Sequence, residues 1–88
     1  MKVKEGFILR EVADSYVIVA VGEASRHFKG VIKVNETAAF LFKEFEKGNF
    51  DTDNLAKLLI GEYNVYYDQA KKDVEDFIQS LKDGKILE

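Results

Sequence analysis

Histidine and carboxylate side chains are the groups in this 88-residue chain that could do acid–base or metal chemistry. His27 is the single histidine and there is no cysteine, so neither a Cys–His nucleophilic pair nor a usual zinc ligand set can form. Asp73, Glu75 and Asp76 lie close together in the sequence, but nothing marks a cleft around them. We interpret Asp73 and Asp76 as part of a solvated helix face, and we expect no catalytic residue.

The glycines also lack a pattern that would bind a nucleotide or phosphate. Gly22, Gly30 and Gly48 lie far apart, whereas a phosphate-binding loop needs closely spaced glycines that let backbone amides approach the ligand. We therefore expect no enzyme, no metal and no cofactor, and we interpret the chain as a binding protein.

The length and composition of the chain favour one small folded domain, residues 1–88. Hydrophobic residues make up 47% of the sequence and aromatic residues 12%, which is typical of a globular protein. No segment is long and apolar enough to span a bilayer, and the residues from Met1 to Gly6 show no signal-peptide pattern. We expect a cytoplasmic protein that does not bind membranes.

The net charge of −3 is unevenly distributed along the chain. Residues 1–34 contain six Lys or Arg and four Asp or Glu, whereas residues 35–88 contain seven basic and twelve acidic residues. The second half is therefore a poor nucleic-acid binder, because affinity for a duplex depends largely on neutralising phosphates. The mildly basic first half could favour an acidic peptide, or it could be ordinary solvated surface.

The first half of the sequence predicts three strands. We expect strands at residues 7–12, 16–21 and 31–34, with a turn at 13–15 and a polar loop at 22–30. Residues 16–21 are all apolar, which predicts a central strand buried on both faces. The simplest arrangement is an antiparallel meander.

The second half predicts three amphipathic helices, at about 36–47, from Asp51 or Thr52 to about 63, and at about 67–82. Gly48, Asn64 and Gly84 are expected to end them. The buried stripes are expected to be Ala38, Leu41, Phe42 and Phe45; Leu55, Leu58, Leu59 and Tyr63; and Ala70, Val74, Phe77, Ile78 and Leu81. The order βββααα predicts an α+β fold, a three-stranded antiparallel sheet followed by a three-helix bundle, compatible with a winged-helix-like body.

The junction between the third strand and the first helix is the most informative part of the sequence. The apolar period changes from two to 3.6 at Asn35, and Asn is a strong helix cap. A strand that runs directly into a capped helix cannot be followed by a tight hairpin, so we expect it at a sheet edge. An open edge can accept a strand from another chain, including a second copy of this chain in a homodimer.

The same junction carries a resemblance to a known family. The segment from Val34 to Phe42 resembles the strand-to-helix segment of the PqqD family, and Gly6–Glu11 resembles its opening strand. Residues 62–65 and the last helix with its tail, ending at Leu87, are similar to the same family. Tyr66 and Tyr67 stand where members often have Asp or Ser, so we expect a helix cap weaker by about 1 kcal/mol.

The resemblance implies a function as a peptide chaperone. PqqD-like domains are recognition elements for ribosomally made, modified peptides: they bind the leader segment of the precursor and present it to a modifying enzyme, often a radical SAM protein. The leader adds as a strand beside the third strand and lies over the third helix. That implies a peptide-binding site formed by Gly30, Val31, Ile32, Lys33, Val34, Lys71, Val74, Phe77 and Ile78.

Within that site, the residues have different expected roles. The backbone from Gly30 to Val34 would supply hydrogen bonds, and Val31 and Lys33 are the strand side chains expected to contact the leader. Lys71 could pair with a leader carboxylate, contributing only about 0.2–1 kcal/mol if the pair is exposed.

The main alternative is a winged-helix DNA-binding regulator. It requires a basic recognition helix, whereas residues 67–82 contain three lysines and four acidic residues. The sequence therefore favours a peptide over a nucleic acid as the partner.

Overall fold

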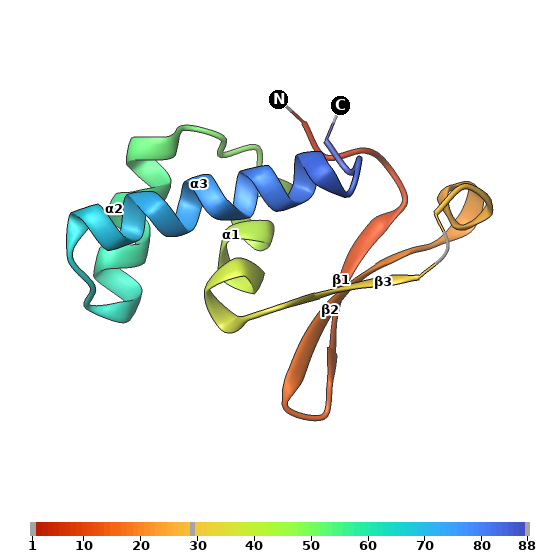
Figure 1. The fold of residues 1–88 in the computed structure, drawn as a ribbon, viewed down its shortest axis with the longest axis horizontal. Coiled ribbons are helices and arrows are strands. Elements are labelled where there is room, and N and C mark those ends of the chain that lie inside the picture. Colours follow the sequence, from red (N-terminus) through yellow and green to blue (C-terminus); the bar gives the residue numbers. More distant parts are fainter. Residues whose placement is uncertain (1, 29, 88) are drawn as a thin grey trace.

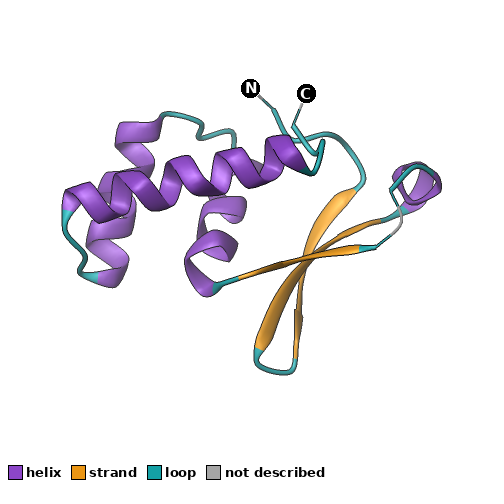
Figure 2. Cartoon of the chain, viewed as in Figure 1, coloured by secondary structure: helices purple, strands orange, loops and turns teal. Residues whose placement is uncertain are grey.

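The computed structural model describes residues 2–28 and 30–87, which form three strands followed by three α-helices (Figure 1; Figure 2). This confirms the predicted α+β class and the order of elements. The elements are β1 (Phe7–Val12), β2 (Ser15–Ala20), a short 3-10 helix η1 (Gly22–Arg26), β3 (Val31–Val34), α1 (Glu36–Glu46), α2 (Thr52–Tyr63) and α3 (Tyr67–Asp83).

The sheet is an antiparallel meander with β2 in the centre, as predicted. A two-residue turn, Ala13–Asp14, joins β1 to β2, and Ala13 takes the left-handed conformation with φ of 55°. The hairpin projects away from the helices (Figure 1).

The prediction that the central strand is buried on both faces is wrong. Of the residues of β2, only Ile18 is fully buried; the others are partly exposed, and Val21, just beyond the strand, is 37% exposed. The helices lie on one side of the sheet (Figure 2). Because Ile18 faces the core, alternation along β2 turns the side chains of Val17 and Val19 to the other face. The predicted loop at 22–30 also differs, because it contains η1; Lys29 in this loop lies outside the described residues.

The strand-to-helix junction is confirmed. β3 passes into α1 through Asn35, whose side-chain oxygen accepts the backbone N–H of Ala38 at 2.8 Å. α2 begins in the same way, because Asp51 accepts the backbone N–H of Asn54 at 2.9 Å, and it ends at Asn64 in the left-handed conformation. Side-chain capping of this kind satisfies amides that the first turn leaves without a partner.

α1 lies between the sheet and the other two helices. It contacts all three strands and also α2 and α3, while α2 and α3 pack against each other. The predicted stripe of α2 is only partly correct: Leu55 and Leu59 are buried, but Leu58 is 36% exposed. The fully buried large side chains are Phe42, Phe45, Ile18, Leu41, Leu55, Leu59, Leu81, Ile86 and Val74.

The two ends of α3 are held differently. Its start has no side-chain cap at Tyr66, as expected. The Tyr67 hydroxyl instead donates to the Asp53 carboxylate at 2.6 Å, and this bond raises the pKa of Tyr67 above its ordinary value. At the other end, Gly84 lies against β3, where an added Cβ would be only 3.0 Å from Cδ1 of Ile32.

Candidate functional site

The outer edge of β3 has backbone groups whose direction follows from the register. The N–H of Val21 donates to the Gly6 carbonyl at 2.7 Å, continuing the β1–β2 ladder in which Val19 and Val17 also face β1. Because hydrogen-bonded pairs alternate along an antiparallel ladder, Ile18 must bond to β3 instead.

The pairs that join β2 to β3 are therefore Ile18–Ile32 and Tyr16–Val34. The N–H and C=O groups of the alternate residues, Val31 and Lys33, point away from β2. No described segment pairs with this side of β3, so the predicted edge is open.

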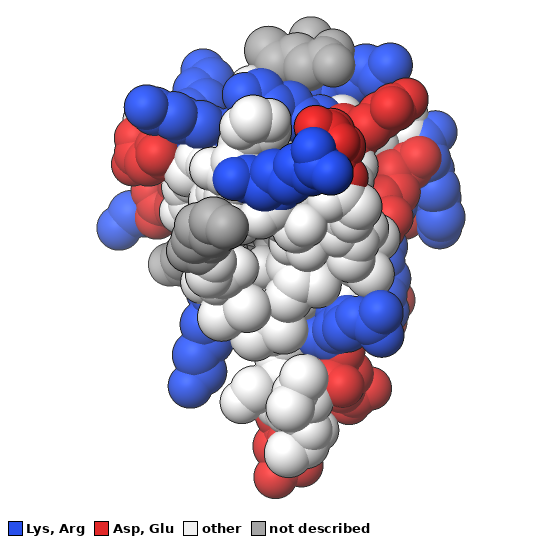
Figure 3. Space-filling model, turned by 90° about the vertical axis from the view of Figure 1, so that its right-hand side faces the viewer, with Lys and Arg blue, Asp and Glu red and all other residues white. Residues whose placement is uncertain are grey.

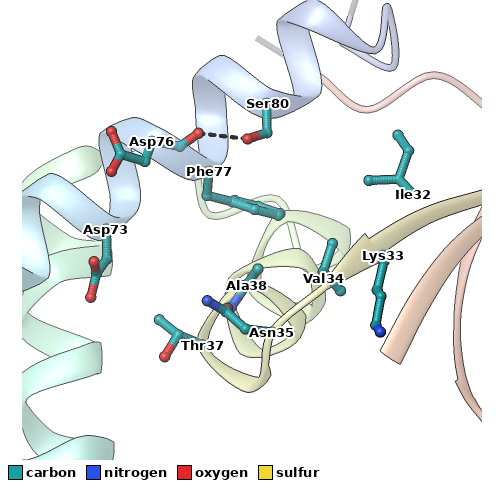
Figure 4. Close-up of a pocket in the computed structure, with 10 residues that line it drawn as sticks. All are labelled: Ile32, Lys33, Val34, Asn35, Thr37, Ala38, Asp73, Asp76, Phe77 and Ser80. Atoms are coloured by element: carbon teal, nitrogen blue, oxygen red, sulfur yellow. Dashed lines mark hydrogen bonds between the residues drawn. The ribbon is translucent and has the colours of Figure 1, made fainter. Parts of the chain in front are cut away.

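An open edge does not by itself identify a site, because no segment among residues 2–28 and 30–87 pairs with the outer side of β1 either. What distinguishes β3 is a groove of about 260 Å³ alongside it (Figure 4). Three elements form its walls: β3 with the residue that follows it, the first turn of α1, and the middle of α3. The lining residues are Ile32, Lys33, Val34, Asn35, Thr37, Ala38, Asp73, Asp76, Phe77 and Ser80.

The floor of the groove is apolar and rigid. The ring of Phe77 points from α3 toward Val34 and Ala38 (Figure 4). It is only 5% exposed, and it packs edge-to-face on Phe45 with 5.6 Å between ring centroids. A side chain that entered the groove would meet a fixed aromatic surface, which gives large contact area at little entropic cost.

The α3 wall of the groove carries negative charge. Asp73 is half-buried and accepts a hydrogen bond from the Gln69 amide at 2.8 Å, and Asp76 is exposed. Neither carboxylate forms an ion pair within the described part of the chain. Both can therefore still accept a cationic group from a bound molecule.

Four of the predicted site residues line this groove: Ile32, Lys33, Val34 and Phe77. Gly30 and Val31 lie on the same edge without lining the groove.

The other three predicted residues lie elsewhere on α3. Val74 is fully buried in the core, and Ile78 is half-buried but does not line the groove. Lys71 is exposed and lies two residues before Asp73. Two residues correspond to about 200° around a helix, so the Lys71 side chain points to another side of α3.

The polar residues that line the groove were not predicted from the sequence, although their spacing carries a signal. Asp73, Asp76, Phe77 and Ser80 follow the spacing i, i+3, i+4 and i+7, which places them on one face of α3. From the sequence, the two aspartates are interpreted as a solvated helix face, because nothing in the sequence marks a cleft around them. Only the position of β3 makes their face the wall of a groove.

A second depression of about 760 Å³ lies between the N-terminal segment, η1 and the end of α3. Phe7 and Phe28 contribute apolar surface there, packed edge-to-face at 5.3 Å, and His27 lies at its margin. No group of acidic or histidine side chains able to hold a metal ion occurs within residues 2–28 and 30–87. Within the same ranges, no helix has the length and apolar character needed to cross a bilayer.

Comparison with known proteins gives one family and one fold. Residues 15–87 match the family model for coenzyme PQQ synthesis protein D (PqqD). No match was found among curated proteins.

Two similar solved structures have the same fold. One is described as TbiB1 in complex with the TbiA(beta) leader peptide; the TM-score is 0.76 at 17% identity, covering 100% of this chain and 95% of that one. The other is described as lasso peptide synthetase B1 complexed with the leader peptide; the TM-score is 0.70 at 20% identity, covering 93% and 89%.

Proposed function

Because the chain belongs to the PqqD family, we propose that it binds the leader segment of a ribosomally made precursor peptide and presents it to a modifying enzyme. The observation that carries this proposal is the open edge of β3 beside an apolar groove. Support also comes from the two structures of the same fold that contain leader peptides.

In this proposal the leader adds as a fourth strand next to β3. The N–H and C=O groups of Val31 and Lys33 hydrogen-bond to it, and each bond contributes about 0.5–1.5 kcal/mol. These bonds are independent of the leader's side chains, so they give affinity without selecting a sequence.

Selectivity in this proposal comes from the groove. Side chains of the added strand alternate between its two faces, so those next to Ile32 and Val34 enter the groove. The floor at Phe77 favours an apolar side chain, and the carboxylates of Asp73 and Asp76 favour a Lys or Arg beside it. The acidic peptide considered from the sequence fits this wall poorly.

The proposed role is non-catalytic, so the chemistry belongs to the enzyme that receives the presented peptide. A radical SAM protein is the class that the family resemblance implies for that enzyme. A homodimer through β3 would occupy the same edge as the leader, and the two states would therefore compete. DNA binding is not favoured, since α3 contains five acidic residues and three lysines.

Replacing Val31 with proline tests the proposal, because proline removes an amide that points out of the edge. We expect Val31→Pro to weaken binding of a synthetic leader peptide by about tenfold, measured by calorimetry. The leader sequence for this test is to be taken from short precursor-like genes found by searching the region around the gene of this chain.

The control for this experiment is Glu11→Pro. Because Val12, Arg10 and Ile8 bond to β2, Glu11 carries an outward amide on the other edge of the sheet. It should leave leader affinity unchanged. Strand addition at β3 would be contradicted if both variants lost leader affinity equally, or if neither variant lost any.

A further inference from the structure

The sheet face opposite the helices is here called the outer face, and its strand residues are mostly aliphatic. Figure 3 shows an uncharged surface on this side of the molecule. Alternation along the strands places six aliphatic side chains on the outer face. None of the six belongs to the hydrophobic core or packs against it. They are Ile8, Val12, Val17, Val19, Val21 and Val31.

The exposure of these side chains is high for a small sheet. Val12 is 57% exposed and Val31 60%, while Val17 and Val19 in the centre are half-buried only by their neighbours. Contiguous exposed apolar surface of this kind marks an interaction site in soluble proteins. A partner that covered it would complete the two-sided burial that β2 was predicted to have.

The charges on the outer face have one sign. Arg10 and Lys33 lie on either side of Val17 in the register, and none of the paired strand residues on this face is acidic. In Figure 3 basic side chains lie to either side of the uncharged patch, and acidic side chains lie at its lower end. This is the reverse of the whole chain, whose net charge is −3.

These charges select among the occupants of the face. A second copy of the chain stacked there would bring its own Arg10 and Lys33 against the same two cations, which is unfavourable. A partner protein whose surface has an apolar centre and carboxylates at its margin would instead match both the valines of the outer face and the cations of Arg10 and Lys33.

The outer face is continuous with the proposed leader site. Val31 and Lys33 direct their backbone groups to the open edge and their side chains to the outer face. A leader strand paired with them would therefore place its own alternate side chains in the same surface, next to Val31 and Lys33.

We propose that the outer face is the docking surface for the peptide-modifying enzyme, through an apolar patch of that enzyme bordered by carboxylates. The identity of this partner and the part of the surface contributed by the leader rest on the proposed function; the apolar and basic character of the face formed by this chain does not. Because the enzyme would touch both chains at once, leader and enzyme would each raise the other's affinity by the same factor.

The test measures binding of a purified peptide-modifying enzyme that acts on the same precursor, with and without the synthetic leader. Arg10→Glu reverses a charge on β1, the strand farthest from the leader site, and Val17→Thr makes the centre of the face polar while keeping a β-branched side chain. We expect each change to weaken enzyme binding by about tenfold. Leader affinity measured without the enzyme should stay within about twofold of wild type.

Lys57→Glu is the matched control, since Lys57 is an exposed lysine on α2 and its reversal changes the net charge equally. It should leave enzyme binding unchanged. Equal loss in this control, no enzyme binding by the wild-type chain, or no effect of Arg10→Glu and Val17→Thr would overturn the proposal.

Two other measurements would also contradict it. The first is that the chain alone sediments as a dimer and that Arg10→Glu disrupts this dimer, which would make a second copy the occupant of the outer face. The second is that the chain cosediments with vesicles rich in phosphatidylserine, which would make a membrane the occupant. If the enzyme result holds but the leader does not pair with β3, the docking surface survives and strand addition fails. The two proposals can therefore fail separately.

Discussion

At the scale of single residues, the α3 wall of the groove decides what kind of leader the site can select. Asp73 and Asp76 have no cationic partner among the described residues, and both face the groove beside Phe77. Two carboxylates that share a wall repel each other, and a bound Lys or Arg would relieve that repulsion. The proposed leader therefore carries a basic residue next to an apolar one.

Neutralising both carboxylates tests this selectivity. Asp73→Asn combined with Asp76→Asn should weaken binding of a Lys- or Arg-containing leader by about fivefold and reduce the salt dependence of that binding. Titration at low and high salt measures both effects. Glu62→Gln combined with Glu75→Gln removes the same charge away from the groove, and similar weakening there would show that only net charge matters.

Single residues were also the hardest feature to predict from the sequence. The apolar period identified Phe77 as a buried residue, which it is, but could not indicate that one edge of its ring faces a groove. Lys71 looked suitable as a charged contact, yet the helix turns it away. Three elements form this groove, and the sequence of one element does not contain the positions of the others.

At the scale of elements, local signals predicted most boundaries to within a residue. Asn35 and Asp51 cap the helices that their positions indicated, and Asn64 ends α2. These signals are local because a capping side chain bonds to an amide only three residues away. η1 was missed because its five polar or small residues look like a loop.

The strand β2 shows the limit of apolar patterns. Its run of apolar residues correctly indicated a central strand, but not that the helices cover a single face. A sequence records that a face is apolar, and not whether its own chain or another protein covers it. The proposed docking of an enzyme on the outer face accounts for that mismatch.

The end of α3 lies close to β3 at Gly84, and a substitution there tests whether this close approach controls the groove. A Cβ there would lie 3.0 Å from Cδ1 of Ile32 and 3.4 Å from the Ser80 carbonyl, both in residues that line the groove. Gly84→Val should therefore push α3 away from β3 and lower the free energy of unfolding by about 1–3 kcal/mol. Urea denaturation measures the stability, and leader titration measures the accompanying loss of affinity.

Gly61 provides the comparison for this substitution. It lies within α2, where an added Cβ meets nothing within 4 Å. Gly61→Val should leave stability unchanged or slightly improved, because valine is a better helix former than glycine. Were Gly84→Val equally harmless, the close approach of α3 to β3 would not control the groove.

At the scale of the whole molecule, the fold separates two surfaces by placing all three helices on one side of the sheet (Figure 1). The groove lies on the helical side of β3, and the outer face lies on the other side. One strand therefore borders both surfaces, and a leader added to it would be exposed to both. This arrangement suits a protein that holds a peptide with one surface and an enzyme with the other.

Hydrogen–deuterium exchange of single amides, read by NMR with and without the synthetic leader, tests strand addition most directly. The amides of Ile32 and Val34 already bond to β2, whereas those of Val31 and Lys33 point to the open edge. We predict that the leader slows exchange at Val31 and Lys33 by at least about tenfold, with smaller changes at Ile32 and Val34. Unchanged exchange at Val31 and Lys33 when the leader is bound, or new protection on the outer edge of β1, would contradict the account.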